Sequence, residues 1–381
     1  MQEYGECDKV ELMTSEHAAA WLRLSLTHGV GPMLGRRLLA ATGGVDALWA
    51  ATASELESVN GMGPQLLAAL AASHTGPAED ILMLCATQQI GILCPDDPEW
   101  PSALADLDDA PLLLFYRGDP ACLSHRPMLA MVGARRASRE GRLLTRRWSG
   151  YCSQQGLTII SGMAFGIDAA AHAGALEAHG ATIAVLGCGL LTLTEEQQQQ
   201  VAAIAGQGCV LSEFLPGQPA RPEHFPRRNR VIAGLAQATL VMEADIRSGS
   251  LITARLAGEY GRDVFAVPGS VLASNHAGCH QLIRDGAMLI ERAEDLLQQM
   301  GVKAGMSAAL RAGKHYHPTN AREADLLMAM AGQAVHLDLL AETCGLTLPE
   351  LSPILLRLEL QGVIERLPGS RYLLAMELSD T

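Results

Sequence analysis

The sequence predicts an α/β protein built on an extended Rossmann-like, doubly wound and mostly parallel sheet, flanked by a helical N-terminal domain and a C-terminal winged helix. Three observations support this fold class. Six apolar strand candidates lie between residues 128 and 269, helical stretches separate most of them, and glycines follow the first strands. Apolar strands that alternate with helices are typical of a parallel sheet buried on both faces. We expect these strands at Met128–Ala134, Leu157–Gly162, Ala181–Gly187, Cys209–Phe214, Ala238–Ala244 and Asp263–Gly269.

Residues 1–76 are expected to form a small domain of the helix-hairpin-helix or SAM-like type. His28-Gly-Val-Gly-Pro32 and Asn60-Gly-Met-Gly-Pro64 repeat a Gly-x-Gly-Pro turn ahead of a helical stretch. Backbone amides of such hairpins contact DNA phosphates. Basic residues other than Arg36 and Arg37 are missing from these helices, so a helical domain that contacts protein stays open as the alternative.

Residues 77–302 are expected to form the extended Rossmann-like domain, which we predict to bind DNA. Its first part, residues 77–125, is a connecting layer with a helix at Ala78–Gln89 and strands at Gly91–Cys94 and Leu112–Gly118. The six strands of the parallel sheet follow. Ligands of such sheets bind beyond the carboxyl ends of the strands, so the residues directly after each strand are the candidates for a site.

Residues 303–321 are small and polar and are expected to be a linker. Residues 322–381 follow the winged-helix pattern of three helices and a hairpin. The helices are expected at Arg322–Ala331, His336–Thr343 and Leu348–Gln361, and the hairpin strands at Val363–Arg366 and Arg371–Leu374. From residue 319 to the end there are four basic and nine acidic residues, a charge of 4 − 9 = −5. We therefore expect this domain to contact protein rather than DNA.

The bulk composition limits the class of protein. The 381 residues are 49% hydrophobic and carry a net charge of −13. No apolar run reaches the roughly 18 residues of a membrane span, and the acidic N-terminus is unlike a secretory signal. Nine cysteines without a CxxC pair are typical of a reduced compartment, and no zinc pattern is present. We expect a cytoplasmic protein without a membrane span, a metal or a cofactor.

The strand ends predict a phosphate site. Leu129-Ala-Met-Val132 and Leu157-Thr-Ile-Ile160 each run into a glycine turn and then a helix, which directs backbone N–H groups and helix N-termini to one place. Arginines and an asparagine gather in the same loops, and guanidinium forks match phosphate. Phe225 could stack on a base, or pack in the core. The candidate DNA-binding residues are Gly133, Arg135, Arg136, Ser161, Gly162, Gly166, Phe225, Arg227, Arg228, Asn229, Arg230, Ser248 and Gly249.

A second group of residues is expected to support these loops. Asp168 would cap the helix that follows and accept hydrogen bonds from loop amides, and His172, four residues later, would be a packing histidine rather than a metal ligand. The other members of this group are Glu213, Glu243, Pro268 and Gly269. Neither a Walker lysine motif nor a GxSxG elbow is present, so we expect a binding protein and not an enzyme.

The chain resembles the DNA-processing protein A (DprA/Smf) family of bacteria from roughly Pro95 to Leu297. The ordered motifs that carry the resemblance are Val132-Gly-Ala-Arg135, Ser161-Gly-Met-Ala-Phe-Gly-Ile-Asp168 with His172, Ser212-Glu213, Phe225-Pro-Arg-Arg-Asn-Arg230, Glu243 with Ser248-Gly-Ser250 and Thr253-Ala254, and Val267-Pro-Gly269. Two stretches depart from the family pattern. Leu190-Leu-Thr-Leu-Thr194 replaces an Asp and a Tyr-Pro, and His280 replaces an asparagine.

The resemblance implies a homodimer that binds single-stranded DNA without a nucleotide cofactor. It also implies that the protein protects incoming DNA and loads a RecA-type recombinase during natural transformation. Two alternatives stay open from the residues. One is an enzyme that cleaves nucleotides at the glycosidic bond with Glu213 or Glu243 as the acid–base group. The other is an adaptor for protein partners with a vestigial pocket.

Overall fold

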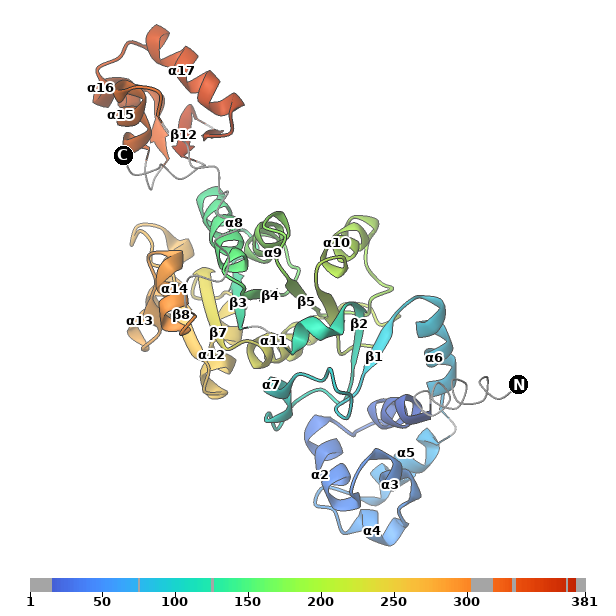
Figure 1. Ribbon diagram of the computed structural model, residues 1–381. Helices are drawn as coiled ribbons and strands as arrows, with labels where there is room; N and C mark the ends of the chain where they lie inside the picture. The colour runs from blue at the N-terminus through green and yellow to red at the C-terminus, as the bar shows by residue number, and fades with distance from the viewer. Residues whose placement is uncertain are drawn as a thin grey trace. The chain divides into compact units, whose positions relative to one another are not determined.

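The computed structural model describes residues 16–74, 76–124, 127–302, 318–330, 334–367 and 369–374. The N-terminal helices and the large sheet form one compact unit, and the C-terminal residues form a second (Figure 1). The α/β fold class, with its N-terminal helices and C-terminal winged helix, is confirmed. Most of the predicted linker at 303–321 lies outside the described residues, and the three predicted boundaries between the four segments stay predictions.

The large sheet has nine strands in the order β1-β2-β6-β5-β4-β3-β7-β8-β9. From β6 to β9 all neighbours are parallel, whereas β1 and β2 are antiparallel and β2 joins β6 antiparallel. All six predicted parallel strands are present. The bounds are β1 Gly91–Leu93, β2 Leu114–Gly118, β3 Met128–Gly133, β4 Thr158–Ser161, β5 Thr182–Leu186, β6 Cys209–Ser212, β7 Ala238–Glu243, β8 Asp263–Ala266 and β9 Met288–Leu289. The short strand β9 was not predicted.

Helices cover both faces of this sheet, as in Figure 1. The second half of α8 packs closely on α9, and α9 and α10 contact β3 to β6 from one face. On the other face α11 and α12 contact β3, β4, β5, β7 and β8. The central strands β3 to β7 are mostly apolar because both faces of the sheet are buried there. The bounds are α8 Arg139–Gln154, α9 Ile167–Glu177, α10 Glu195–Ala205, α11 His224–Leu235, α12 Ser250–Glu259, α13 Ala277–Arg284 and α14 Ala293–Gln299.

The connectivity creates a crevice at one edge of the sheet. From β3 the chain steps outward through β4, β5 and β6, then returns to β7 on the other side of β3. The loops after β3 and β7 therefore leave the sheet as neighbours with helices on opposite faces. Such a reversal of strand order is where open α/β sheets bind ligands. The ladder shifts register between Val132 and Gly133, so the end of β3 already departs from regular pairing at this point.

The N-terminal helices pack on the sheet unit. Both Gly-x-Gly-Pro turns lead into helices, because α2 and α5 begin at Pro32 and Pro64, as predicted. Arg36 does not point to a ligand: its guanidinium donates to the carbonyls of Ala105 and Leu107 beside α7. This helical layer also includes residues 16–26. The bounds are α2 Pro32–Thr42, α3 Val45–Ala50, α4 Ala53–Glu57, α5 Pro64–Ser73, α6 Ala78–Thr87 and α7 Ser102–Ala105.

The C-terminal unit is a winged helix with its own apolar core. It contains α15 Ala321–Ala329, β10 Val335–His336, α16 Leu337–Cys344, α17 Leu348–Leu360, β11 Ile364–Leu367 and β12 Arg371–Leu374. The three helices and the hairpin were predicted, and β10, which pairs with β12, was not. Arg357 of α17 forms an ion pair with Glu323, whose side chain is buried, at 2.6 Å. This arginine is the one basic residue of α17, the helix in the recognition position.

Within the described residues, no single helix has the length and apolar composition needed to cross a membrane. The helices Leu337–Cys344 and Leu348–Glu359 have the required length and apolar composition only when they are taken together, and they are bent by 110° relative to each other.

Candidate nucleic-acid interface

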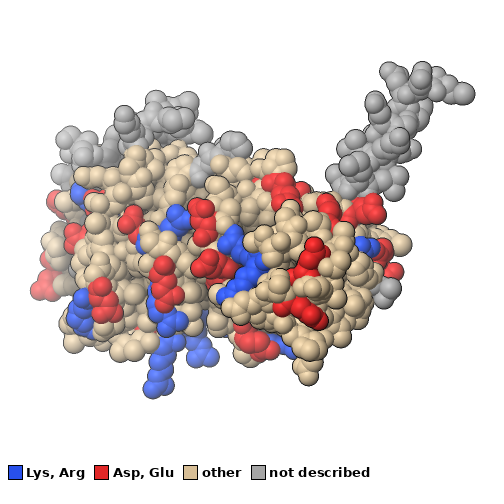
Figure 2. All heavy atoms as spheres, turned by 90° about the horizontal axis from the view of Figure 1, so that it is seen from below, with Lys and Arg blue, Asp and Glu red and all other residues tan. Residues whose placement is uncertain are grey.

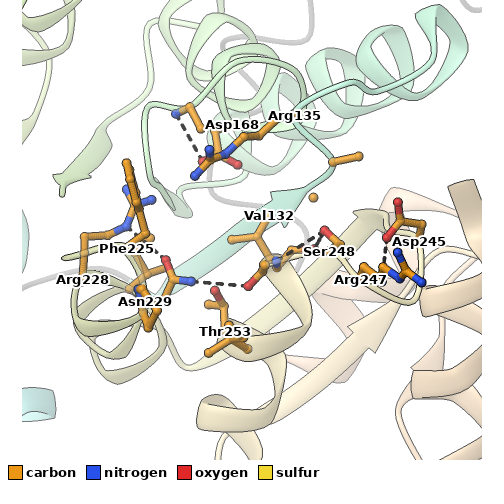
Figure 3. Close-up of a pocket in the computed structure, with 18 of the residues that line it drawn as sticks. Val132, Arg135, Asp168, Phe225, Arg228, Asn229, Asp245, Arg247, Ser248 and Thr253 are labelled. Carbon is orange, nitrogen blue, oxygen red and sulfur yellow. Dashed lines mark hydrogen bonds between the residues drawn. The ribbon is translucent and has the colours of Figure 1, made fainter. Parts of the chain in front are cut away.

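A pocket of about 680 Å³ opens at the crevice between the ends of β3 and β7. Its walls come from the loop after β3, the first turns of α11, and the loop between β7 and α12. Figure 3 shows Arg135 and Asp168 at one end of it, Arg228 and Asn229 along one side, and Arg247 on the opposite side. The predicted site residues that line it are Gly133, Arg135, Arg136, Asp168, Phe225, Arg228, Asn229, Ser248 and Gly249.

Three arginines give the pocket its accessible positive charge. Arg135, Arg136 and Arg247 line it, and all three side chains are exposed. Among the described residues none of the three has an acidic side chain within ion-pair distance. The Asp245 carboxylate instead accepts a hydrogen bond from the backbone N–H of Arg247 at 2.7 Å. These guanidinium groups are therefore available to an anion, for which Arg has a suitable planar fork.

Phe225 holds Arg135 in place. The Arg135 guanidinium lies over the Phe225 ring, 4.8 Å from its centroid. Gly187 packs against the same ring, because a Cβ there would lie 3.1 Å from Cδ1 of Phe225. A cation over an aromatic face is attracted by the ring quadrupole, by roughly 0.5–1 kcal/mol at exposed sites. Phe225 therefore orients the arginine at the mouth of the pocket.

Arg228 lines the pocket but is buried and bonded to the chain, and its predicted role as a DNA ligand stays a prediction. Its side chain is 5% exposed, and Nη1 donates to the carbonyls of Gly162 and Val185, so it ties the end of β4 to β5. Gly162 is required here, since a Cβ would lie 2.2 Å from Nη1. Burial lowers the pKa of Arg228, and nearby Asp168 opposes that shift. Asn229 accepts from Nε of Arg228 and donates to the Gly249 carbonyl, so it links Arg228 to the loop after β7.

Arg227 and Arg230 do not reach the pocket. Both pair with the nearly buried Glu213, Arg227 through two hydrogen bonds at 2.7 and 3.0 Å. Arg230 also donates to the carbonyl of Asp109. The sequence prediction placed all the arginines of this motif in one site because it could not tell which faces of α11 would be buried. Glu213 thus holds Arg227 and Arg230, and its predicted role in supporting the site stays a prediction.

Asp168 organises the loop that follows β4. Its Oδ2 accepts hydrogen bonds from the backbone N–H groups of Gly162 and Ala164 at 3.2 and 3.3 Å, as predicted. The predicted cap is wrong, because Gly166 occupies the N-cap position and makes no side-chain hydrogen bond. Burial raises the pKa of the Asp168 carboxyl, against the opposing effect of the Arg228 guanidinium.

His172 is a packing histidine on the buried face of α9. Its Nδ1 lies 2.7 Å from the hydroxyl oxygen of Thr182, and that hydroxyl donates its own proton to the Ile159 carbonyl. Nδ1 must therefore be the donor. Nε2 has no hydrogen-bond partner among the described residues. Burial lowers the pKa of His172 to about 3.

The remaining predicted residues support the pocket from outside its lining. The Ser161 hydroxyl donates to the Met131 carbonyl at 2.6 Å, which joins β3 to β4 inside the sheet. Glu243 is fully buried and accepts from the side-chain amide of Asn275. Pro268 and Gly269 follow β8, and His280 donates from Nε2 to the Gly269 carbonyl at 3.0 Å. His280 thus still forms one hydrogen bond in place of the family's asparagine.

Sequence reasoning missed Arg247 and Asp245, which both line the pocket. They lie directly after β7 and before the glycine-serine turn, so the rule that ligands bind beyond strand ends could have found them.

Outside the pocket, basic and acidic side chains are mixed on the surface. In Figure 2 the blue and red side chains of the described residues are interspersed on a mostly tan face. A net charge of −13 is thus compatible with a basic site confined to one pocket.

Comparison with known proteins gives family matches over both units. The sequence model of the DNA recombination-mediator protein A family matches residues 91–301, and that of the DprA winged helix domain matches residues 313–370. Protein Smf of Synechocystis sp. is 33% identical over 94% of this chain and 99% of the relative. DNA processing protein DprA of Streptococcus pneumoniae is 44% identical over 53% of this chain and 72% of that protein.

Solved structures show the same similarity in three dimensions. The X-ray structure of DprA from Streptococcus pneumoniae covers 74% of this chain and 97% of its own, with a TM-score of 0.65 and 34% identity. The structure of DNA processing protein A from Helicobacter pylori, described as giving insight into its single-stranded DNA binding mode, covers 56% of this chain and 95% of its own, with a TM-score of 0.50 and 28% identity.

Proposed function

The chain belongs to the DNA recombination-mediator protein A (DprA/Smf) family, and from this premise we propose that it binds single-stranded DNA in the pocket between β3 and β7. The observation that carries the proposal is the gathering of Arg135, Arg136 and Arg247, all exposed and without acidic partners among the described residues, in a chain whose net charge is −13. A polyanion is the ligand that such a site favours.

The chemistry of the pocket suits a phosphate backbone. The arginines supply guanidinium donors, and α12 begins at Ser250 directly after pocket-lining Ser248 and Gly249, so its N-terminal amides lie beside the pocket. Contacts of this kind position a strand but carry no base code. The strand would therefore bind with little sequence preference and with an affinity that falls steeply as salt rises.

We extend the proposal to the biological role that the family suggests. The protein would protect incoming single-stranded DNA and load a RecA-type recombinase onto it during natural transformation, acting as a homodimer in the cytoplasm. The recombination-mediator description of the matching family and the DNA-processing relatives support this role. The Helicobacter pylori protein, whose structure concerns single-stranded DNA, supports the choice of ligand.

The rival proposal of a nucleotide-cleaving enzyme loses its catalytic candidates in this geometry. Glu213 is held by two arginines and Glu243 by Asn275, and neither residue lines the pocket. A general acid–base group must lie within hydrogen-bond reach of the bond it cleaves. We therefore propose binding without chemistry. Incubation with nucleoside monophosphates should release no free base, and release that persists after purification to homogeneity would favour the enzyme.

The direct test is a binding titration. Fluorescence anisotropy with a labelled oligothymidine and with a duplex of equal length, measured from low to high salt, gives both affinities. We expect tighter binding of the single strand and a linear fall of log K with log salt. Equal or tighter binding of the duplex, or no binding of the single strand at low salt, would contradict the proposal.

A further inference from the structure

Phe165 is an exposed aromatic side chain at the rim of the pocket. It is 73% exposed and lies in the loop between β4 and α9. Among the Phe, Trp and Tyr residues that the structure describes, it is the one in the exposed class. Met163 and Ile167, two residues away on either side, both point into the core. The loop therefore turns its neighbours inward and leaves the large apolar ring in water, where it gains nothing from burial.

The loop that carries Phe165 is fixed on both sides of the ring. Asp168 accepts from Gly162 and Ala164 before it, and the backbone N–H of Ile167 donates to the Ala134 carbonyl after it. Gly166 has a φ of +83°, a conformation that only glycine adopts readily. The ring is thus presented from a rigid turn, so that little backbone order has to be gained when a ligand packs on it.

This turn lies against the loop that carries Arg135. A Cβ on Gly166 would lie 2.3 Å from the Ala134 carbonyl oxygen and 2.6 Å from that of Arg135, so the two backbones are in contact. Ala164 and Asp168 line the pocket, whereas Phe165 between them does not. Phe165 therefore stands beside the pocket rather than in it. The ring is thus carried by a loop whose backbone touches that of the loop with Arg135.

The other aromatic residue of the site is already engaged. Phe225 is only partly exposed, with the Arg135 guanidinium over its ring and Gly187 packed against it. Phe165 has no ring or cation contact of this kind among the described residues. It is consequently the aromatic surface that a base can reach without displacing a side chain.

We propose that Phe165 is a base-stacking residue, which takes the base of a nucleotide next to the one whose phosphate Arg135 binds. This inference rests on the proposed function. Stacking on an aromatic ring is tolerant of sequence, because every base has a π-face. Base stacking is a contact that a polyanion without bases cannot make. A duplex can make it only if a base pair opens. The site would therefore bind single-stranded DNA more tightly than either a polyanion without bases or a duplex.

The test compares two ligands of equal length and charge, an oligothymidine and a strand of abasic nucleotides. Phe165→Ala should weaken binding of oligothymidine on the order of 5- to 10-fold. It should leave binding of the abasic strand unchanged within about twofold, since the phosphate contacts remain. Phe165→Trp should retain the affinity and Phe165→Leu should not, which separates stacking from general apolar contact. Leu272→Ala, which removes a 94% exposed apolar side chain from the turn after β8, is the control.

The outcomes separate this inference from the proposed function. If Arg135→Ala weakens both ligands but Phe165→Ala weakens neither, or weakens both equally, the stacking role is wrong and the phosphate site stands. If the wild-type protein binds neither ligand, the proposed function and the stacking role fail together. If Phe165→Ala leaves DNA binding intact but abolishes capture of the recombinase, the ring belongs to a protein interface and the inference is overturned.

Discussion

At the scale of the residue, exposure decides what each arginine of the site does. Arg135 and Arg228 both come from motifs that the sequence associates with DNA. Arg135 is exposed, whereas Arg228 is 5% exposed, with Nη1 on two backbone carbonyls and Nε on the Asn229 side chain. Three of the five N–H donors of Arg228 are therefore already used within the chain. We therefore expect Arg135 and its exposed neighbours to make the main phosphate contacts, while Arg228 keeps the loops around them in place.

This division predicts different effects of two substitutions. Arg228→Ala leaves the carbonyls of Gly162 and Val185 without their donor and Asp168 without its nearby cation. We expect the free energy of unfolding to fall by about 3–5 kcal/mol, which is typical when one partner of a buried charged pair is removed. Urea denaturation measures it. Arg135→Ala should leave the unfolding midpoint unchanged, and a midpoint for Arg228→Ala equal to that of the wild type would show that the buried network is not needed.

His172 gives a prediction about pH. Its pKa in the folded protein is about 3, below the ordinary value of 6.5. Between these values the unfolded chain binds a proton that the folded chain does not, so stability falls as pH falls. The contribution is about 1.4 kcal/mol for each pH unit below 6.5. The difference between the urea midpoints at pH 7 and pH 5 should therefore be smaller in His172→Gln than in the wild type. The same pH dependence in both proteins would assign the loss to other groups.

At the scale of the element, the positions of the strands in the sequence were predictable, but their order in the sheet was not. Apolar runs such as Leu157–Ile160 are long enough to mark a buried parallel strand from sequence. The strand order needs contacts between distant residues, so the antiparallel join of β2 to β6 had no local signal. The two-residue strand β9 is too short to produce a periodic pattern. The same holds for the site. The sequence identified the loops that follow the strands, but it did not distinguish the buried arginines from the exposed ones.

The strand β9 carries a prediction about assembly. It ends the order of the large sheet, and Met288 and Leu289 are both exposed on it. An exposed apolar edge strand is a template for pairing with another chain, which supports the proposed homodimer. We expect Leu289→Lys to shift the molecular mass measured by light scattering from that of a dimer to that of a monomer. A wild-type protein that is monomeric at micromolar concentration, or a variant that stays dimeric, would exclude this edge as the contact.

At the scale of the whole molecule, charge is divided between the two units. The pocket gathers exposed arginines, whereas the sequence from residue 319 onward has a charge of −5 and Arg357 of α17 is paired with Glu323. A winged helix that gripped a phosphate backbone would offer several basic side chains from this helix. Family membership alone does not decide this point, which depends on the charges of this particular chain.

The winged helix is therefore expected to contribute little to DNA affinity. Arg366 and Arg371 are exposed basic residues of its hairpin. Reversing both charges, as Arg366→Glu with Arg371→Glu, should change the affinity for single-stranded DNA by less than about twofold at moderate salt, because we expect the phosphate contacts to come from the pocket arginines. A gel shift with purified protein measures this. A tenfold loss would place the hairpin on the DNA.

The central claim is that exposed arginines at the β3–β7 crevice hold the phosphates of a single strand. Its most direct test is the slope of log K against log salt for oligothymidine. Arg135→Ala should weaken binding of oligonucleotides of every sequence alike and make the slope shallower by about 0.7, the value for one phosphate contact on a single strand. Arg255→Ala, which removes another exposed arginine, paired with Glu259 on α12 outside the pocket lining, should match the wild type. An unchanged affinity and slope for Arg135→Ala would contradict the account.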